Sequence, residues 1–258
     1  MSISLTPTIE QLISLAQYGG KYRLTAAREI AYLDTDVDLD KLFWLIDILS
    51  TDVESPEFSE LGIALSKLLE RMNEEKIVHI SEMLLNSKNR KLLLTIVLSN
   101  LRKEIDPNFL SEIVRRLLMD SSEEVRNGAL GVLRNLYNTI GKDEVLDILY
   151  EIVTSENRVL KKFLPTIILS VYDFLDTASI EDLLLRILDE SDEEVLHSLL
   201  DTLRIGLLDH LAKSEKVVWE LAKKIKSLNR EDIITYFARI LLEEKTRWQK
   251  LVDFLTKD

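Results

Sequence analysis

The 258-residue chain contains no cysteine, only seven glycines and only four prolines. Without cysteine there can be no disulfide bond, no cysteine-liganded metal and no thiol nucleophile. Glycine and proline supply the special dihedral angles of tight turns, so their scarcity disfavours a sheet protein and favours helices joined by short connections. The lack of cysteine also fits an intracellular protein, and we expect a cytoplasmic one.

Basic residues are also in deficit, with 33 Lys and Arg against 45 Asp and Glu and a net charge of -12. Phosphate backbones and anionic lipid headgroups repel a chain of this charge. The most apolar segment, residues 163–175, is too short to span a membrane and contains Pro165 and Asp173. The N-terminus lacks the basic and apolar regions of a signal peptide. We therefore expect no membrane association, and the net charge disfavours nucleic acid.

Signatures of chemistry are missing as well. No Gly-x-Ser-x-Gly nucleophile turn occurs, and Gly19-Gly20 is not followed by the Gly-Lys-Ser/Thr of a phosphate loop. The acidic run at 189–194 lacks the glycine and the alternating oxygen ligands of a calcium loop. No close metal-ligand motif is formed by the three histidines, which are His79, His197 and His210. The sequence predicts no enzyme, no cofactor and no metal site.

An internal repeat is the strongest positive feature. Residues 109–126 align without gaps with a second segment that ends at Val195, and both contain Ser-x-Glu-Glu-Val, at 121–125 and at 191–195. The offset of 70 residues corresponds to two repeats of about 35, a length typical of helix-pair repeats. From Val125 onward, apolar residues recur at spacings of three and four, which places them on one helical face.

The same pattern predicts antiparallel helix pairs along nearly the whole chain. The first helices of the pairs are predicted over 8–17, 39–49, 74–85, 107–119, 142–153, 179–188 and 214–225. The second helices are predicted over 22–33, 56–72, 89–102, 123–140, 157–175, 193–211 and 230–243. Thr6-Pro7 and Asp106-Pro107 each read as an N-cap followed by proline at the first helical position. The connections are short, and short connections force neighbouring helices to be antiparallel.

The fold class predicted is therefore all-α, as one domain over residues 1–258 with about seven helix pairs. A last helix over 246–257 carries Trp248, Leu251, Val252 and Leu255 on one face, and we expect it to cap the final pair. Two further tryptophans, Trp44 and Trp219, stand among aliphatic residues and are predicted to lie in the core.

The segment Asp120-Ser-Ser-Glu-Glu-Val-Arg126, followed by Ala129 and Leu133, resembles the consensus of HEAT repeats. This resemblance to the HEAT and armadillo class implies a right-handed superhelical solenoid. It also implies that Asp120 and Arg126 belong to a ladder between neighbouring repeats. The copy at Val195 has Leu196 in place of the arginine, which interrupts such a ladder.

The resemblance further implies that the second helices line a concave surface that binds a protein or a peptide. The predicted function is thus a non-enzymatic interaction scaffold, with a DNA-repair or other nucleic-acid-binding protein of the HEAT-like type as the alternative. A basic strip on this surface suits an acidic partner; without one, the partner is basic or apolar. The partner-binding candidates are the basic residues of the second helices, namely Arg90, Arg126, Arg134, Arg158, Lys161, Lys162 and Arg204.

Overall fold

The computed structural model describes residues 6–189, 192–211, 215–243 and 248–256, and these residues form helices and connections without any strand. The predicted helix starts at 214 and 246 and the predicted end at 257 lie outside the described residues. The chain divides into two compact units, Met1–Ile140 and Gly141–Asp258. The single domain over 1–258 stays a prediction. None of the described helices combines the length and apolar character needed to cross a bilayer.

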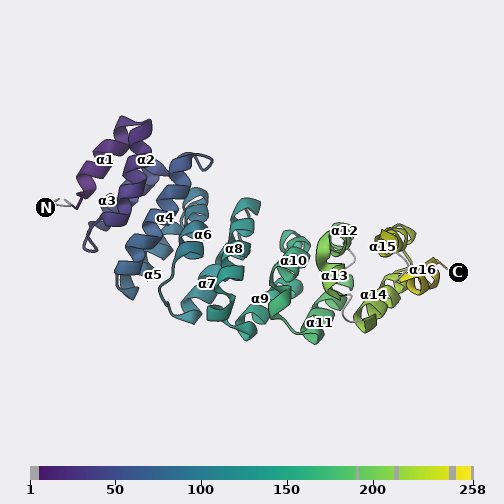
Figure 1. Ribbon diagram of the computed structural model, residues 1–258. Helices are drawn as coiled ribbons and strands as arrows, with labels where there is room; N and C mark the ends of the chain where they lie inside the picture. Colours follow the sequence, from purple (N-terminus) through teal and green to yellow (C-terminus); the bar gives the residue numbers. More distant parts are fainter. Residues whose placement is uncertain (1–5, 190–191, 212–214, 244–247, 257–258) are drawn as a thin grey trace. The chain divides into compact units, whose positions relative to one another are not determined.

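In the N-terminal unit, each second helix packs on the next second helix (Figure 1). α2 lies against α4, α4 against α6, and α6 against α8, while α1 contacts both α2 and α3. A short 3-10 turn, Ile30–Tyr32, extends α2. The helices of this unit are α1 (Ile9–Tyr18), α2 (Lys21–Glu29), α3 (Leu39–Leu49), α4 (Pro56–Arg71), α5 (Glu74–Leu84), α6 (Lys88–Asn100), α7 (Pro107–Leu118) and α8 (Glu123–Ile140).

The second helices of this unit approach one another closely where α4 and α8 carry glycine. A Cβ atom on Gly62 of α4 would lie 2.4 Å from Cγ2 of Ile96 in α6. A Cβ atom on Gly128 of α8 would lie 2.6 Å from Oγ1 of Thr95, also in α6. Both distances are far below a van der Waals contact, so α6 is packed on both sides at positions where only glycine fits.

Two local predictions about this unit are wrong. Thr6 is not the N-cap of the first helix: α1 begins at Ile9, and Thr8 forms a capping box with Gln11. Trp44 is 52% exposed rather than buried, because it lies on the side of α3 opposite to the buried stripe that includes Leu42 and Ile46. The other cap is confirmed, since Asp106 accepts the N–H of Phe109 and Pro107 is the first residue of α7.

In the C-terminal unit, the second helices again form a row. α10 packs on α12 and α12 on α15, while α9 packs on α11 and α11 on α14. The helices are α9 (Lys142–Thr154), α10 (Arg158–Val171), α11 (Thr177–Leu188), α12 (Glu193–Thr202), α13 (Leu208–Leu211), α14 (Glu215–Ser227), α15 (Glu231–Glu243) and α16 (Gln249–Thr256). α16 covers α14 and α15 and buries Leu251, Val252 and Leu255.

One predicted helix of this unit is interrupted. The sequence predicts an unbroken helix over 193–211, but α12 ends at Thr202 and a π-helical turn, Leu203–Leu207, joins it to α13. Gly206 has non-helical dihedral angles within this turn. Glycine is among the weakest helix formers, which explains why the break occurs there.

Candidate functional site

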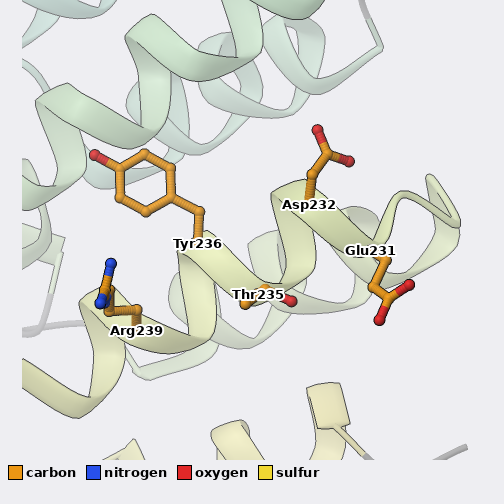
Figure 2. Close-up of a pocket in the computed structure, with 5 residues that line it drawn as sticks. All are labelled: Glu231, Asp232, Thr235, Tyr236 and Arg239. Carbon is orange, nitrogen blue, oxygen red and sulfur yellow. The ribbon is translucent and has the colours of Figure 1, made fainter.

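The candidate site is the polar surface that α10, α12 and α15 form together in the C-terminal unit, called here the α10–α12–α15 surface. One open hollow of about 490 Å³ lies over α10 and α12, and its lining residues are Arg158, Lys162, Glu193, Glu194, His197, Ser198 and Asp201. A second hollow of about 630 Å³ lies along α15 (Figure 2), and its lining residues are Glu231, Asp232, Thr235, Tyr236 and Arg239. Both hollows are lined mainly by charged and polar side chains.

Between α10 and α12 the basic side chains are matched by carboxylates. Nη2 of Arg158 and Nζ of Lys162 each lie 3.2 Å from a carboxylate oxygen of Glu194. Nε of Arg158 also pairs with Asp192, which caps α12 by accepting the N–H groups of Glu194 and Val195. Desolvation alone raises the pKa of Asp192, but these N–H groups and Arg158 together hold it below its usual value. Arg158 and Lys162 are therefore largely neutralised.

Between α12 and α15 an imidazole lies among two carboxylates and a guanidinium. Nε2 of His197 lies 3.7 Å from Oε1 of Glu193 and 4.0 Å from Oδ2 of Asp232. Nη2 of Arg230 lies 2.7 Å from the same oxygen of Asp232 and 3.5 Å from the same oxygen of Glu193. The hydrogen bond from Arg230 is the main reason why the pKa of Asp232 is below its ordinary value, so this carboxylate is ionised at neutral pH.

A tyrosine forms a second link between α12 and α15. The Tyr236 hydroxyl donates a hydrogen bond of 2.5 Å to Oδ1 of Asp201, and Figure 2 shows its ring extending away from the axis of α15. This hydrogen bond to a carboxylate raises the pKa of Tyr236, because ionisation would place two negative charges side by side. The surface is thus crossed by specific polar contacts from α10 to α15.

The seven predicted partner-binding residues are divided between the two units. Arg90, Arg126 and Arg134 belong to the N-terminal unit, whereas Arg158, Lys161, Lys162 and Arg204 belong to the C-terminal unit. Arg158, Lys162 and Arg204 are exposed on α10 and on the turn after α12, and Lys161 is half-buried. Arg134 is exposed on α8.

Arg90 and Arg126 serve the fold instead of a free surface. The Arg90 guanidinium makes a bidentate contact with Asp47, at 2.8 and 2.6 Å, and lies over the ring of Phe43. Arg126 is only 5% exposed, and its Nη1 donates to the carbonyl oxygens of Asp120 at 2.7 Å and Ser121 at 2.9 Å. We therefore leave both out of the partner-binding set.

The Asp120 carboxylate takes part in a link between helices. Its partner in this link is Lys91, whereas the prediction paired it with Arg126. Its carboxylate pairs with Nζ of Lys91 in α6 at 2.5 Å and accepts the N–H of Ser122 at 2.8 Å. Burial opposes ionisation of Asp120, but Lys91 and Ser122 hold its pKa below the usual value. The ladder of Asp120 and Arg126 through successive repeats stays a prediction.

The sequence prediction missed the acidic half of the site. Glu193 and Glu194 belong to the acidic run that lacks the pattern of a calcium loop, and no motif in the sequence singles out Asp232. A signal for them exists in the repeat length, because polar pairs between neighbouring helix pairs recur at similar sequence separations. Examples are Arg23 with Glu57 at 34, Lys142 with Asp176 at 34, Lys162 with Glu194 at 32, and Tyr236 with Asp201 at 35 residues.

Comparisons with known proteins leave the family open. No family model matches the sequence, and no curated protein matches it. The crystal structure of an engineered protein resembles this chain with 19% identity, over 77% of this chain and 97% of that one. Its TM-score is 0.31, a likeness that carries no argument about fold or function.

Proposed function

We propose that this protein is a non-enzymatic interaction scaffold, and that it binds a basic segment of a partner protein on the α10–α12–α15 surface. The observation that carries this proposal is the row of three second helices whose two open hollows are lined by exposed carboxylates. Binding to such a surface requires no chemistry from the protein, only complementary charge and shape.

The charge of the partner follows from the pairing of the basic residues. Arg158 and Lys162 are occupied by Asp192 and Glu194, while Glu231 is exposed at the start of α15. Lysine and arginine side chains of a partner are suited to carboxylates through charge-assisted hydrogen bonds. The net charge of -12 attracts such a segment from a distance and repels phosphates. The contacts therefore favour a basic peptide over an acidic one and give no support to the nucleic-acid alternative.

The proposal includes a HEAT-like architecture, a right-handed superhelical solenoid of about seven helix pairs with α16 as its cap. Its support is twofold. Within each unit, second helices pack on second helices in chain order. Polar pairs between successive helix pairs recur at separations near the repeat length. A solenoid built in this way presents one long face made of the same helix from each repeat.

The test compares two variants that remove equal charge from opposite layers of the C-terminal unit. Glu194→Gln with Glu231→Gln changes the α10–α12–α15 surface. Asp143→Asn with Asp147→Asn, both exposed on α9, is the matched control. Proteins captured from lysate of the native organism are quantified for the wild type and both variants, and captured basic segments are then titrated as peptides.

We expect the surface variant to lose the captured partner and the α9 variant to retain it. Equal recovery by all three proteins would remove the α10–α12–α15 surface from consideration. Binding of duplex DNA at about 50 mM salt, where phosphate contacts are strong, would instead favour the nucleic-acid alternative.

A further inference from the structure

The α10–α12–α15 surface contains a group of side chains with the composition of a metal site. Glu193 and His197 are four residues apart on α12, so they lie on the same face of the helix. Asp232, at the start of α15, approaches them from the neighbouring helix. One ligand atom from each of the three lies within 4.8 Å of the other two. Two helices thus bring an imidazole nitrogen and two carboxylate oxygens to one point.

The distances are close to those of an occupied site. Ligands at about 2.1 Å from a tetrahedral Zn²⁺ lie about 3.4 Å from one another. The observed separations from Nε2 of His197 are 3.7 Å to Glu193 and 4.0 Å to Asp232. A contraction of about 0.3 to 0.6 Å brings the imidazole to this spacing from each carboxylate. The two carboxylate oxygens lie within 4.8 Å of each other and would have to approach by at most about 1.4 Å, for which the side chains of Glu193 (63% exposed) and Asp232 (49% exposed) have room.

We infer that Glu193, His197 and Asp232 bind a divalent transition-metal ion of the zinc class. Imidazole together with carboxylates suits Zn²⁺ and its neighbours in the first transition row, whereas Mg²⁺ and Ca²⁺ prefer oxygen ligands throughout. Three protein ligands leave a coordination position open to water or to a side chain of a bound molecule. The ion would tie α12 to α15. This inference does not depend on the identity of any protein partner.

Arg230 provides an internal check on the inference. Its guanidinium contacts the same two carboxylate oxygens that would bind the ion, at 2.7 Å from Asp232 and 3.5 Å from Glu193. A guanidinium and a metal ion compete for these oxygens, because both satisfy the same negative charge. Removing the guanidinium should therefore strengthen metal binding, an effect that a loss of folding cannot imitate.

The chain also offers a matched control. Glu75 and His79 on α5 repeat the four-residue spacing of Glu193 and His197, and His79 is exposed. Among the described residues, His79 is not part of any group of three such ligands. The two helices thus present the same pair, but only α12 has the third ligand.

The test is titration of the full-length protein with ZnCl₂ by isothermal calorimetry, repeated with Co²⁺ to record its visible absorption. We expect one saturable site, a loss of affinity of at least about 10- to 100-fold in His197→Ala and Asp232→Asn, and no change in His79→Ala. Arg230→Gln should bind more tightly than the wild type. The inference is wrong if His197→Ala binds as the wild type does, if His79→Ala weakens binding equally, or if Arg230→Gln leaves the affinity unchanged.

Discussion

Two small groups of basic side chains, one in each unit, are used differently. In the N-terminal unit, where other basic residues pair with carboxylates, Arg71 donates to the backbone carbonyl oxygens of Ala31 and Leu33 at 2.8 and 2.6 Å, and Lys76 donates to that of Thr35 at 2.7 Å. In the C-terminal unit, Arg158 and Lys162 both pair with the exposed carboxylate of Glu194. A cation on a carbonyl satisfies an otherwise unpaired acceptor and belongs to the fold. A cation paired with an exposed carboxylate is held weakly, so a charged side chain of a partner can take its place.

The shared Ser-x-Glu-Glu-Val segment shows the same contrast within one motif. In the N-terminal unit the next residue is Arg126, which satisfies the carbonyls of Asp120 and Ser121. In the C-terminal unit it is Leu196, which is 2% exposed and contributes apolar burial instead. The same position of the motif is therefore filled by a hydrogen-bonding guanidinium in one unit and by a hydrocarbon side chain in the other. Substitution of the arginine by leucine measures whether the two side chains stabilise the fold equally.

The largest expected effect concerns the close packing of the N-terminal unit. Gly62→Ala places a methyl group 2.4 Å from Cγ2 and 2.8 Å from Cβ of Ile96, so α4 and α6 must separate. We expect a loss of about 1–3 kcal/mol in the free energy of unfolding, measured by urea titration followed by circular dichroism.

Gly131→Ala on α8 is the control, because the nearest atom to its new Cβ would be Oγ of Ser99 at an ordinary 4.0 Å. Alanine should stabilise this helix by about 0.5–1 kcal/mol. Equal changes in the free energy of unfolding for Gly62→Ala and Gly131→Ala would show that α4 and α6 are not as close as the distances at Gly62 indicate.

The second prediction tests the buried arginine against its apolar counterpart. Arg126→Leu reproduces the residue at 196 but leaves the carbonyls of Asp120 and Ser121 without this donor. We expect a loss of about 1–3 kcal/mol, again by urea unfolding, since unpaired buried acceptors are costly.

Arg134→Leu, on the exposed side of the same helix, should change stability by no more than about 0.5 kcal/mol. If Arg126→Leu changes the stability as little as this control does, arginine and leucine are interchangeable at this position, and the two units do not differ there.

The third prediction concerns the Tyr236 and Asp201 link in the C-terminal unit. The carboxylate of Asp201 raises the pKa of Tyr236, so Asp201→Asn should allow this tyrosine to ionise at lower pH. The measurement is the ultraviolet absorbance of tyrosinate during alkaline titration, with Tyr236→Phe subtracted to isolate the single group. An unchanged curve for Asp201→Asn would show that the hydrogen bond does not persist in solution.

The sequence predicted the fold better than it predicted the site, for physical reasons. Apolar spacing is local, so the helices from α1 to α16 could be located from stripes such as that of Val125 and Ala129. Trp44 was misplaced because its apolar neighbours were considered without its angle around the helix. The site depends on pairs 32 to 36 residues apart, such as Lys162 with Glu194, and local spacing contains no information about them. The contact between His197 and Asp232 also spans about one repeat, but the pairing of these two particular side chains follows only from the way α12 packs on α15.

The smallest expected effect is the acid sensitivity of one surface pair. The hydroxyl of Ser122, the backbone N–H of Glu124 itself and Nζ of Lys88 lower the pKa of Glu124 from 4.5 to about 2. Because the folded pKa is the lower one, this stabilisation is complete above pH 4.5 and is lost as the pH falls toward 2. Glu124→Gln should therefore reduce the difference in unfolding free energy between pH 5 and pH 3, while Glu75→Gln, exposed on α5, serves as the comparison. Added salt should shrink the effect further, since an exposed pair is screened, whereas it should leave the cost of Gly62→Ala unchanged because that cost is steric.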